Sequence, residues 1–514
     1  MASIGIIIKN GLGLTKKLPK QHRDPLESQK AVLQKLLRKS QFTVFGQEFH
    51  FGKILKDDNV IKAFQQEVPI HNYESILKWW KMALQGETSV CWPGKVDYFA
   101  LSSGTSTGSS KYIPVTRSML KAIQKASVKQ ILTLAYCDLP EEFFTKDILM
   151  LGGSTSLDYN GIYYAGDLSG ITTKNIPFWF QPYYKPGKDI SKTRNWQEKL
   201  DYIVTEAHKW DVGAIAGSPS WFQVLLERIV KHNNAKTIHD VWPNLQVFTH
   251  GAVAFEPYKK SFEALLAKPL IYLETYLASE GFIAYQANPN SDGMQMLLRN
   301  GIFYEFIPFT DENIDADGNV KPGVKALTIS EVKQGVDYIL VMSTCAGAWR
   351  YIIGDVIKFI SVENHEITIT GRTKHYISLC GEHLSVENMN NAIEAVSDEL
   401  NIKVKEFAVA GVNYNRDYGH HWFISVDGNV DKETLKQRLD AHLCKVNDDY
   451  CTERKHVLKG LYLDIVPNDL FLGWLKHQGK EGAQIKFPRV LKKEQLQSWQ
   501  RFLAEKGHQT EHLN

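Results

Sequence analysis

The sequence has no strong excess of either charge, no long apolar run and no paired cysteine motif. Lysine and arginine total 60 against 57 aspartate and glutamate residues, a net charge of +3, so charge gives no support to a nucleic-acid or membrane-surface role. No apolar run reaches membrane-spanning length. The short apolar run near the N-terminus precedes its lysines and shows no signal-peptide cleavage pattern. We therefore expect a cytoplasmic protein.

The six cysteines are scattered without a CxxC pair or metal-ligand spacing, which predicts reduced thiols rather than a metal centre. No GxSxG elbow supports a hydrolase, and there is no repeat or low-complexity segment. What is present is typical of a globular protein, with 43% hydrophobic and 23% charged residues. A chain of 514 residues is too long for one ordinary core and predicts a large domain plus a smaller one.

A run of small hydroxyl residues and glycines, SSGTSTGSSK, lies between two predicted strands, 96–101 and 112–116. Gly104 and Gly108 allow the backbone N–H groups to converge on one anion. The hydroxyl donors of this run include Ser102, Ser103, Thr105, Ser106 and Thr107, and its cation is Lys111. The spacing is not that of a Walker P-loop, because three residues separate the glycines and a strand follows. A phosphate-binding loop is one interpretation, and a solvated linker is the other.

From residue 194 helices and strands are predicted to alternate, which indicates a mostly parallel sheet covered by helices. The predicted helices are 194–208, 221–231 and 257–267, and the predicted strands are 212–216, 245–249 and 270–274. Ligands bind where such strands end. The loops 249–258 and 275–281 are therefore where a nucleotide site is expected.

These loops carry groups suited to a nucleotide. Gly251 and Ala252 offer open backbone to a base edge, Tyr276 a ring for stacking and Ser279 a hydroxyl. The carboxylate of Glu280 would repel a triphosphate unless a hard cation lay between them, which predicts a Mg²⁺ role. An ordinary turn with a surface glutamate is the alternative.

Further strands are predicted at 324–330, 337–343, 349–360 and 366–370. Asp355 interrupts the apolar run 349–360, where an unpaired carboxylate is costly to bury. Its two oxygens suit the two hydroxyls of a ribose, although a structural ion pair would explain it as well. The aromatic residues Trp179, Tyr183, Trp221 and Phe222 are candidates for an apolar acyl pocket or for ordinary packing.

Five segments in order resemble motifs of the adenylate-forming enzymes, and most of all the auxin-responsive acyl acid amido synthetase family of plants. They are SSGTSTGSSK at 102–111, YLASE at 276–280, RYIIGDVIK at 350–358, GRTKHYISLCGEHLSVE at 371–387 and GAQIKFPRVLK at 482–492. The resemblance implies that Arg372 contacts ribose or phosphate, that Lys374 is the hinge and that Lys486 is the catalytic lysine. It also favours the ribose role of Asp355.

The implied fold is α/β: a large N-terminal domain with mixed or parallel sheets flanked by helices, residues 1–371, a hinge at 372–384 and a small C-terminal α+β domain, residues 385–514. In the small domain we expect a helix-covered antiparallel sheet. His420 and His421 adjoin in a predicted strand, so their side chains should point to opposite faces, which is poor spacing for one metal ion.

The implied reaction consumes ATP, with Mg²⁺, to convert a carboxylic acid to an acyl adenylate and pyrophosphate, then passes the acyl group to an amine, in particular an amino acid, and releases AMP. Glu280 and Lys486 would be catalytic. The small domain is expected to rotate between the two steps. Transfer to a thiol such as coenzyme A, or a non-catalytic nucleotide-binding module, are the alternatives. We expect small-molecule partners only, no nucleic acid or membrane, and favour a monomer.

Overall fold

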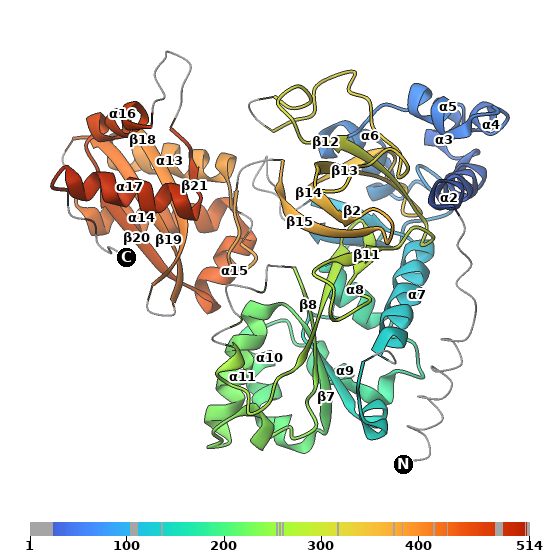
Figure 1. Ribbon diagram of the computed structural model, residues 1–514, viewed down its shortest axis with the longest axis horizontal. Helices are drawn as coiled ribbons and strands as arrows, with labels where there is room; N and C mark the ends of the chain where they lie inside the picture. The colour runs from blue at the N-terminus through green and yellow to red at the C-terminus, as the bar shows by residue number, and fades with distance from the viewer. Residues whose placement is uncertain are drawn as a thin grey trace. The chain divides into compact units, whose positions relative to one another are not determined.

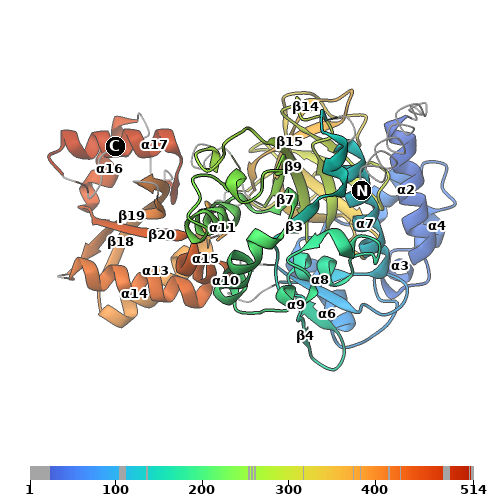
Figure 2. The same ribbon diagram turned by 90° about the horizontal axis from the view of Figure 1, so that it is seen from below.

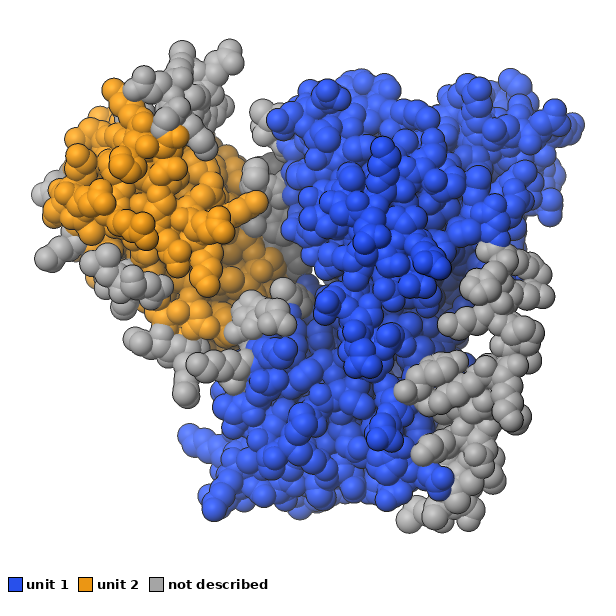
Figure 3. Space-filling view, viewed as in Figure 1, with its two compact units in different colours: residues 1–102, 111–373 blue, residues 103–110, 374–514 orange. Residues whose placement is uncertain are grey.

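The computed structural model describes residues 24–102, 111–134, 137–252, 255, 259, 262–315, 318–373, 376–382, 384–414, 417–428, 430–478, 487–508 and 510. They divide into two compact units, distinguished by colour in Figure 3. The larger unit contains the described part of residues 1–102 and 111–373, and the smaller contains that of residues 374–514. Within the described ranges, every helix is too short or too polar to cross a bilayer.

The larger unit is built on one sheet of eleven strands, in the order β12-β13-β14-β15-β11-β10-β9-β8-β7-β3-β6. Its strands are β3 (Asp147–Met150), β6 (Tyr184–Lys185), β7 (Val212–Gly217), β8 (Val247–Gly251), β9 (Ile271–Ala278), β10 (Gly281–Tyr285), β11 (Met294–Met296), β12 (Ile302–Pro308), β13 (Asp337–Thr344), β14 (Tyr351–Ser361) and β15 (Glu366–Arg372). A second sheet, β2-β1-β5-β4, contains β1 (Tyr98–Ser102), β2 (Lys111–Val115), β4 (Asp158–Tyr159) and β5 (Tyr164–Gly166).

Ten α-helices of the described residues accompany these sheets. They are α2 (Pro25–Ser40), α3 (Val44–Glu48), α4 (Phe51–Ile54), α5 (Val60–Glu67), α6 (Tyr73–Leu84), α7 (Arg117–Thr133), α8 (Leu168–Lys174), α9 (Lys188–Ser191), α10 (Trp196–Glu206) and α11 (Pro219–His232). Helix α2 begins as its sequence indicates, because the carboxylate of Asp24 accepts from the N–H of Leu26. Helix α7 is capped by Thr116, because the Thr116 hydroxyl accepts from the N–H of Met119.

The strands β6, β3, β7, β8 and β9 are parallel, and both faces of this half of the sheet are covered. In Figures 1 and 2, α10 and α11 lie on one side of β7 and α7 on the other. Alternate residues of the strands serve the two faces. Phe248 of β8 packs on Phe222 of α11, with ring centroids 5.5 Å apart, while Val247 packs with Leu134 at the end of α7. The predicted helices 194–208 and 221–231 are thereby confirmed with small changes of bounds. The predicted strands 212–216 and 245–249 are confirmed in the same way, as β7 and β8. Most of the predicted helix 257–267 lies outside the described residues.

The strands β9, β10, β11, β15, β14, β13 and β12 are antiparallel, so the sheet is mixed. In a flat sheet, β9 and β14 would lie about 19 Å apart, since four strand spacings separate them. Yet the hydroxyl of Tyr276 in β9 donates to Asp355 in β14 at 2.5 Å. This half of the sheet is therefore rolled, and its inner face encloses a buried apolar cluster that includes Tyr304 and Phe306.

The predicted strand 324–330 is wrong. Only a single bridge forms there, between Leu327 and Phe306. The segment begins after Gly323, whose φ is +79°, and ends in a turn where Glu331 accepts from both the N–H and the hydroxyl of Thr328, each at 2.8 Å. The segment 324–330 therefore adds one bridge to the edge of β12 and forms no ladder.

At the outer edge of β12, the backbone groups bond to a side chain of α2 and to a loop instead of to another strand. Gln29 of α2 donates to the carbonyl oxygen of Ile302 at 3.1 Å and accepts from the N–H of Tyr304 at 2.7 Å. Beyond it, the N–H of Phe306 donates to Leu327 at 2.9 Å, and the N–H of Leu327 donates back at 2.7 Å. The backbone groups of this edge strand are satisfied within the chain.

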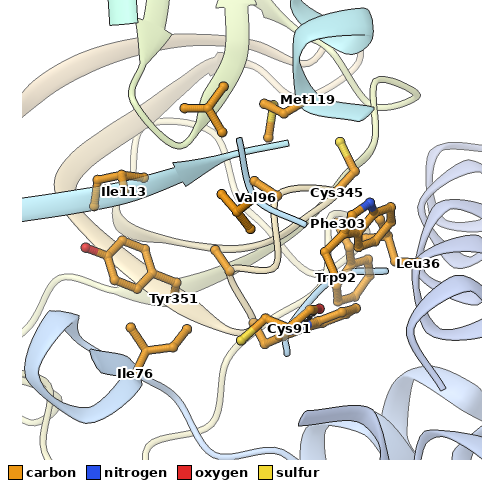
Figure 4. Close-up of a cluster of buried hydrophobic side chains, with 14 of the residues drawn as sticks. Leu36, Ile76, Cys91, Trp92, Val96, Ile113, Met119, Phe303, Cys345 and Tyr351 are labelled. Carbon is orange, nitrogen blue, oxygen red and sulfur yellow. Dashed lines mark hydrogen bonds between the residues drawn. The ribbon is translucent and has the colours of Figure 1, made fainter. Parts of the chain in front are cut away.

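The N-terminal helices pack onto the sheet around a buried aromatic cluster, part of which is drawn in Figure 4 with Trp92, Phe303 and Tyr351. A buried ion pair adjoins this cluster. The guanidinium of Arg350 donates to Glu305 at 2.9 and 3.0 Å, and both side chains are at most 5% exposed. All six cysteines are free thiols.

The smaller unit contains the sheet β20-β19-β18-β21 and five α-helices of the described residues. The elements are β16 (Tyr376–Ile377), β17 (Leu384–Ser385), α13 (Val386–Leu400), β18 (Lys403–Tyr414), β19 (Asp417–Asp427), α14 (Lys432–Val446), α15 (Asp448–His456), β20 (Leu458–Ile465), α16 (Asn468–His477), β21 (Val490–Leu491) and α17 (Lys493–Glu505). The sheet is mixed rather than antiparallel as predicted, since β20 pairs parallel with β19 and β21 parallel with β18. The crossover through α14 and α15 returns the chain in the same direction.

The two adjoining histidines of β19 point to opposite faces, as predicted, and each is held by a buried acid. His420 lies 2.8 Å from Glu382, and His421 lies 2.8 Å from Asp464. Contact with His420 and two backbone N–H groups, against the cost of burial, lowers the pKa of Glu382 to about 2. No group of three acidic, histidine or cysteine side chains suited to a metal ion occurs in the described ranges.

Candidate functional site

The site is organised at the ends of β8 and β9. Strand β9 extends to Ala278, beyond the predicted end at residue 274, because β10 pairs with its second half in a tight hairpin. Tyr276 therefore lies within a strand rather than in a loop, which corrects the prediction. Ser279 and Glu280 form the turn of the hairpin.

Asp355 receives one partner from each side. The Tyr276 hydroxyl donates to its Oδ2 at 2.5 Å, and Arg372, its cross-strand neighbour in β15, pairs with its Oδ1. The Asp355 side chain is 6% exposed and that of Arg372 is 33% exposed. The buried carboxylate is thus held by a guanidinium that still reaches solvent, which is an arrangement open to a further polar ligand.

Glu280 is buried beside this group. Burial raises the pKa of its carboxyl to about 7, and the charge of Asp355 adds to that rise, whereas Lys111 and Arg372 oppose it. These contributions show that the five residues Tyr276, Glu280, Asp355, Arg372 and Lys111 share one electrostatic neighbourhood. Glu280 is not a surface residue of an ordinary turn.

Two tyrosines that the sequence did not single out belong to the same neighbourhood. Tyr351, at the start of β14, is buried, and burial followed by the charge of Glu280 raises the pKa of its hydroxyl well above the ordinary value. The Lys111 ammonium lies 5.2 Å from the ring centroid of Tyr73, whose hydroxyl accepts from the N–H of Tyr112 at 3.0 Å. The signal for Tyr351 was its place in the RYIIGDVIK segment that also contains Asp355.

The end of β8 comes very close to β9. A side chain at Gly251 would overlap the carbonyl oxygen of Thr275, so only glycine fits there. The next residue, Ala252, has φ of 72°, a conformation rarely taken by residues with a side chain. His250 precedes them; burial lowers the pKa of its imidazole to about 4, and its Nδ1 has no hydrogen-bond partner among the described residues.

The four aromatic candidates for an acyl pocket occupy different environments. Trp179 is 50% exposed and meets Phe180 edge-on, while Tyr183 is half-buried. Trp221 and Phe222 are buried on α11; Trp221 packs against Trp196 with centroids 4.5 Å apart. Phe222 is a core residue of the parallel half of the sheet. An acyl-binding role for these residues stays a prediction.

Several predicted residues lie outside the described residues. They are Ser103, Gly104, Thr105, Ser106 and Gly108 of the hydroxyl-rich run, Lys374 of the expected hinge and Lys486 near the C-terminus. The two ends of that run are described. Ser102 ends β1, Lys111 begins β2, and the two are register partners in an antiparallel pair. The strands predicted on each side of the run are therefore confirmed.

Two solved structures share this fold over most of both chains. An acyl acid amido synthetase in complex with 2,4-DB aligns with a TM-score of 0.57 and 16% identity, covering 92% of this chain and 93% of the other. A 2-hydroxyisobutyryl-CoA ligase in complex with 2-HIB-AMP and CoA also aligns with a TM-score of 0.57, at 12% identity, covering 92% and 90%. The chain has the fold of the adenylate-forming enzymes.

Comparison with known protein families assigns the chain to one family. The N-terminal domain of the GH3 family matches residues 14–156 and 128–270, the central domain matches 295–372 and the C-terminal domain matches 387–495. The chain belongs to the GH3 family. Among similar proteins, the jasmonoyl–L-amino acid synthetase JAR4 of Nicotiana attenuata is 24% identical, with 91% of this chain and 92% of that protein covered. The indole-3-acetic acid-amido synthetase GH3.17 of Arabidopsis thaliana is 22% identical, with 71% of each covered.

Proposed function

We propose that the protein is an acyl acid amido synthetase, which uses ATP to adenylate a carboxylic acid and then transfers the acyl group to an amino acid. The observation that carries the proposal is the neighbourhood of Asp355, Arg372 and Glu280 in a chain of the GH3 family. Similar proteins named as synthetases that join acids to amino acids support the same reaction class.

Asp355 is proposed to bind the ribose. Each carboxylate oxygen can accept more than one hydrogen bond, so its existing contacts with Tyr276 and Arg372 leave acceptor capacity for the two ribose hydroxyls. Because the Arg372 side chain is one-third exposed, it can also approach a phosphate or the ribose from the solvent side. The backbone at Gly251 and Ala252 is proposed to meet the base, with Tyr276 alongside.

Glu280 suits a magnesium ion. Mg²⁺ is held in nucleotide sites by one or two carboxylates together with phosphate oxygens and water, and a buried carboxyl whose pKa is about 7 gives up its proton readily to a divalent cation. Glu280 would hold the ion, and the bound ion would supply positive charge to the phosphates. Lys111, close enough to lower the pKa of Glu280, would add a second positive charge on the same side.

The chemical logic follows from the poor reactivity of a carboxylate. Attack of the acid on the α-phosphate of ATP displaces pyrophosphate and leaves AMP as a good leaving group. Negative charge grows on the phosphate during that attack, so preorganised cations lower the barrier. Lys486 and the hydroxyl-rich run 102–111 are proposed to contribute here, and the attacking amine would then form the amide and release AMP. We propose that the smaller unit rotates between the two steps about a hinge near Lys374.

The test is acid-dependent pyrophosphate release from ATP and Mg²⁺ with a panel of aryl and alkyl carboxylic acids, with mixed amino acids or coenzyme A as the acceptor. An amide product supports the proposal, whereas a thioester alone would favour a CoA ligase. Silence across the panel with ATP still bound would favour a nucleotide-binding module. Lys486→Ala should slow adenylation about a hundredfold, the usual effect of losing one preorganised charge contact, while Lys480→Ala, which changes a lysine six positions earlier in the sequence, serves as the matched control.

A further inference from the structure

A pocket of about 410 Å³ lies on the larger unit between α2, α7 and the segment joining β11 to β12. The two helices lie side by side in both views of the fold (Figures 1 and 2). The pocket is lined by Ser28, Ala31, Val32, Lys35, Lys125, Lys129 and Arg299. None of these residues belongs to the candidate nucleotide site, so the pocket is a separate feature. Its lining contains four cations and no acidic side chain.

The four cations come from α2, α7 and the segment that joins β11 to β12. On each of the two helices, the spacing of the pocket residues puts them on one face. The α2 residues of the pocket, Ser28, Ala31, Val32 and Lys35, follow the i, i+3, i+4, i+7 pattern, which puts them on one face of the helix. Lys125 and Lys129 of α7 are four residues apart and therefore also share a face. Like charges at this spacing destabilise a helix by a few tenths of a kcal/mol. The arrangement is thus unfavourable unless something offsets the repulsion.

No acid within the described ranges forms an ion pair with Lys35, Lys125, Lys129 or Arg299. Neighbouring cations on the same helices do have partners: Lys30 lies 4.0 Å from Glu27, and Arg117 lies 3.1 Å from Asp97. Burial and then the charges of Lys125 and Arg299 lower the pKa of Lys129. Lys129 is therefore repelled by two of the other three cations of the pocket.

Residues 1–23, which precede the Asp24 cap of α2, offer no compensating charge. Residues 1–23 contain no aspartate or glutamate and add five further cations, Lys9, Lys16, Lys17, Lys20 and Arg23. The compensating negative charge must therefore come from outside this part of the protein.

We propose that this pocket binds a compact polyanion that carries two or more phosphate groups. Its volume is within the range of small-molecule sites, roughly 300–1,000 Å³. Ammonium and guanidinium groups are the usual partners of phosphate oxygens. Four cations around one small pocket match a cluster of phosphates better than a single carboxylate. The same chemistry occurs on soluble polyphosphates and on phosphorylated lipid headgroups, and the proposal is independent of the proposed synthetase activity.

The test uses tripolyphosphate and calorimetry on the full chain, with saturating AMP present to occupy a nucleotide site. Lys35→Gln/Lys129→Gln removes two pocket charges, and Lys30→Gln/Lys121→Gln removes two charges from the same helices outside the pocket. We expect one binding site, weakened about tenfold in the pocket variant because two charge contacts near the surface are lost. The control variant should bind like the wild type. Equal affinities of the three proteins for tripolyphosphate, or no binding at all, would contradict the proposal that the pocket binds a soluble polyphosphate.

Sedimentation with phosphatidylcholine vesicles, with and without a phosphoinositide, distinguishes the source of the phosphates. Phosphoinositide-dependent binding that is lost in Lys35→Gln/Lys129→Gln and kept in the control would assign the pocket to a lipid headgroup. Tripolyphosphate binding without vesicle binding would assign it to a soluble molecule. Failure of both arms refutes the proposal, and because neither arm measures pyrophosphate release, that failure leaves the proposed synthetase reaction untouched.

Discussion

The raised pKa of Glu280 predicts a stability that depends on pH in a defined direction. The ordinary pKa of a glutamate is 4.5, and burial raises that of Glu280 to about 7. Between these values the unfolded chain releases the proton and the folded chain keeps it, so the free energy of unfolding falls as pH rises. At about 1.4 kcal/mol per pKa unit, the loss from pH 4.5 to pH 7 amounts to about 3 kcal/mol.

Replacement of Glu280 by glutamine removes this dependence while keeping the size of the side chain. Relative to wild type, Glu280→Gln should gain about 3 kcal/mol between pH 4 and pH 8. The measurement is urea unfolding of the larger unit, followed by tryptophan fluorescence at several pH values. Burial also lowers the pKa values of His71 and His250 to about 4. These histidines make stability fall as pH drops below about 6.5, but both proteins share that effect and it cancels in the difference.

The exposed Glu363, in the turn between β14 and β15, supplies the control, and Glu363→Gln should follow the wild-type profile. If the profiles of Glu280→Gln and wild type run parallel, the Glu280 carboxyl titrates normally in the folded chain and the reasoning fails. A second test measures how the binding of Mg²⁺ in the presence of ATP depends on pH. A cation that takes the place of the proton should bind more tightly as pH rises toward 7, and the rise should be steeper in wild type than in Glu280→Gln.

Three further substitutions test other parts of the structure. Asp355→Asn should raise the ATP dissociation constant about tenfold or more, since hydrogen bonds to a charged group are lost; an unchanged constant would count against the ribose role. Gly251→Ala should lower stability by about 1–3 kcal/mol in a thermal melt, because the new methyl overlaps the Thr275 carbonyl oxygen. Arg350→Met leaves the buried Glu305 without its cation, although the Gln65 amide still donates to it, and should cost about 3–5 kcal/mol. Replacing both partners by methionine should restore much of that loss, and no recovery would contradict the account.

The elements that local patterns define were predictable. Helix α2 follows from its Asp24 cap and apolar face, and the alternation of helices and strands from α10 to β9 follows from periodicity. The start of α7 was not, because Thr116 and Ser118 are both able to cap. Which one does so depends on where the preceding strand ends.

The site was predictable in its residues but not in its contacts. An isolated carboxylate in an apolar strand marked Asp355, and the resemblance marked Arg372. The bond between Tyr276 and Asp355 depends on the rolling of a sheet across four strand spacings, which leaves no local trace in the sequence. The extension of β9 to Ala278 likewise depends on pairing with β10. Long-range pairing overrode the local pattern in both cases.

The Gln29 side chain that bonds to the edge of β12 affects whether copies of this chain associate with one another. An exposed edge strand is a template on which a second molecule can add its own strand, and aggregation begins in this way. Gln29 occupies the donor and acceptor positions that such a strand would use. At the opposite edge, β6 has only two residues and is followed by Pro186, which has no N–H to offer. A chain shortened past α2 would lose the first of these protections and should self-associate through β12.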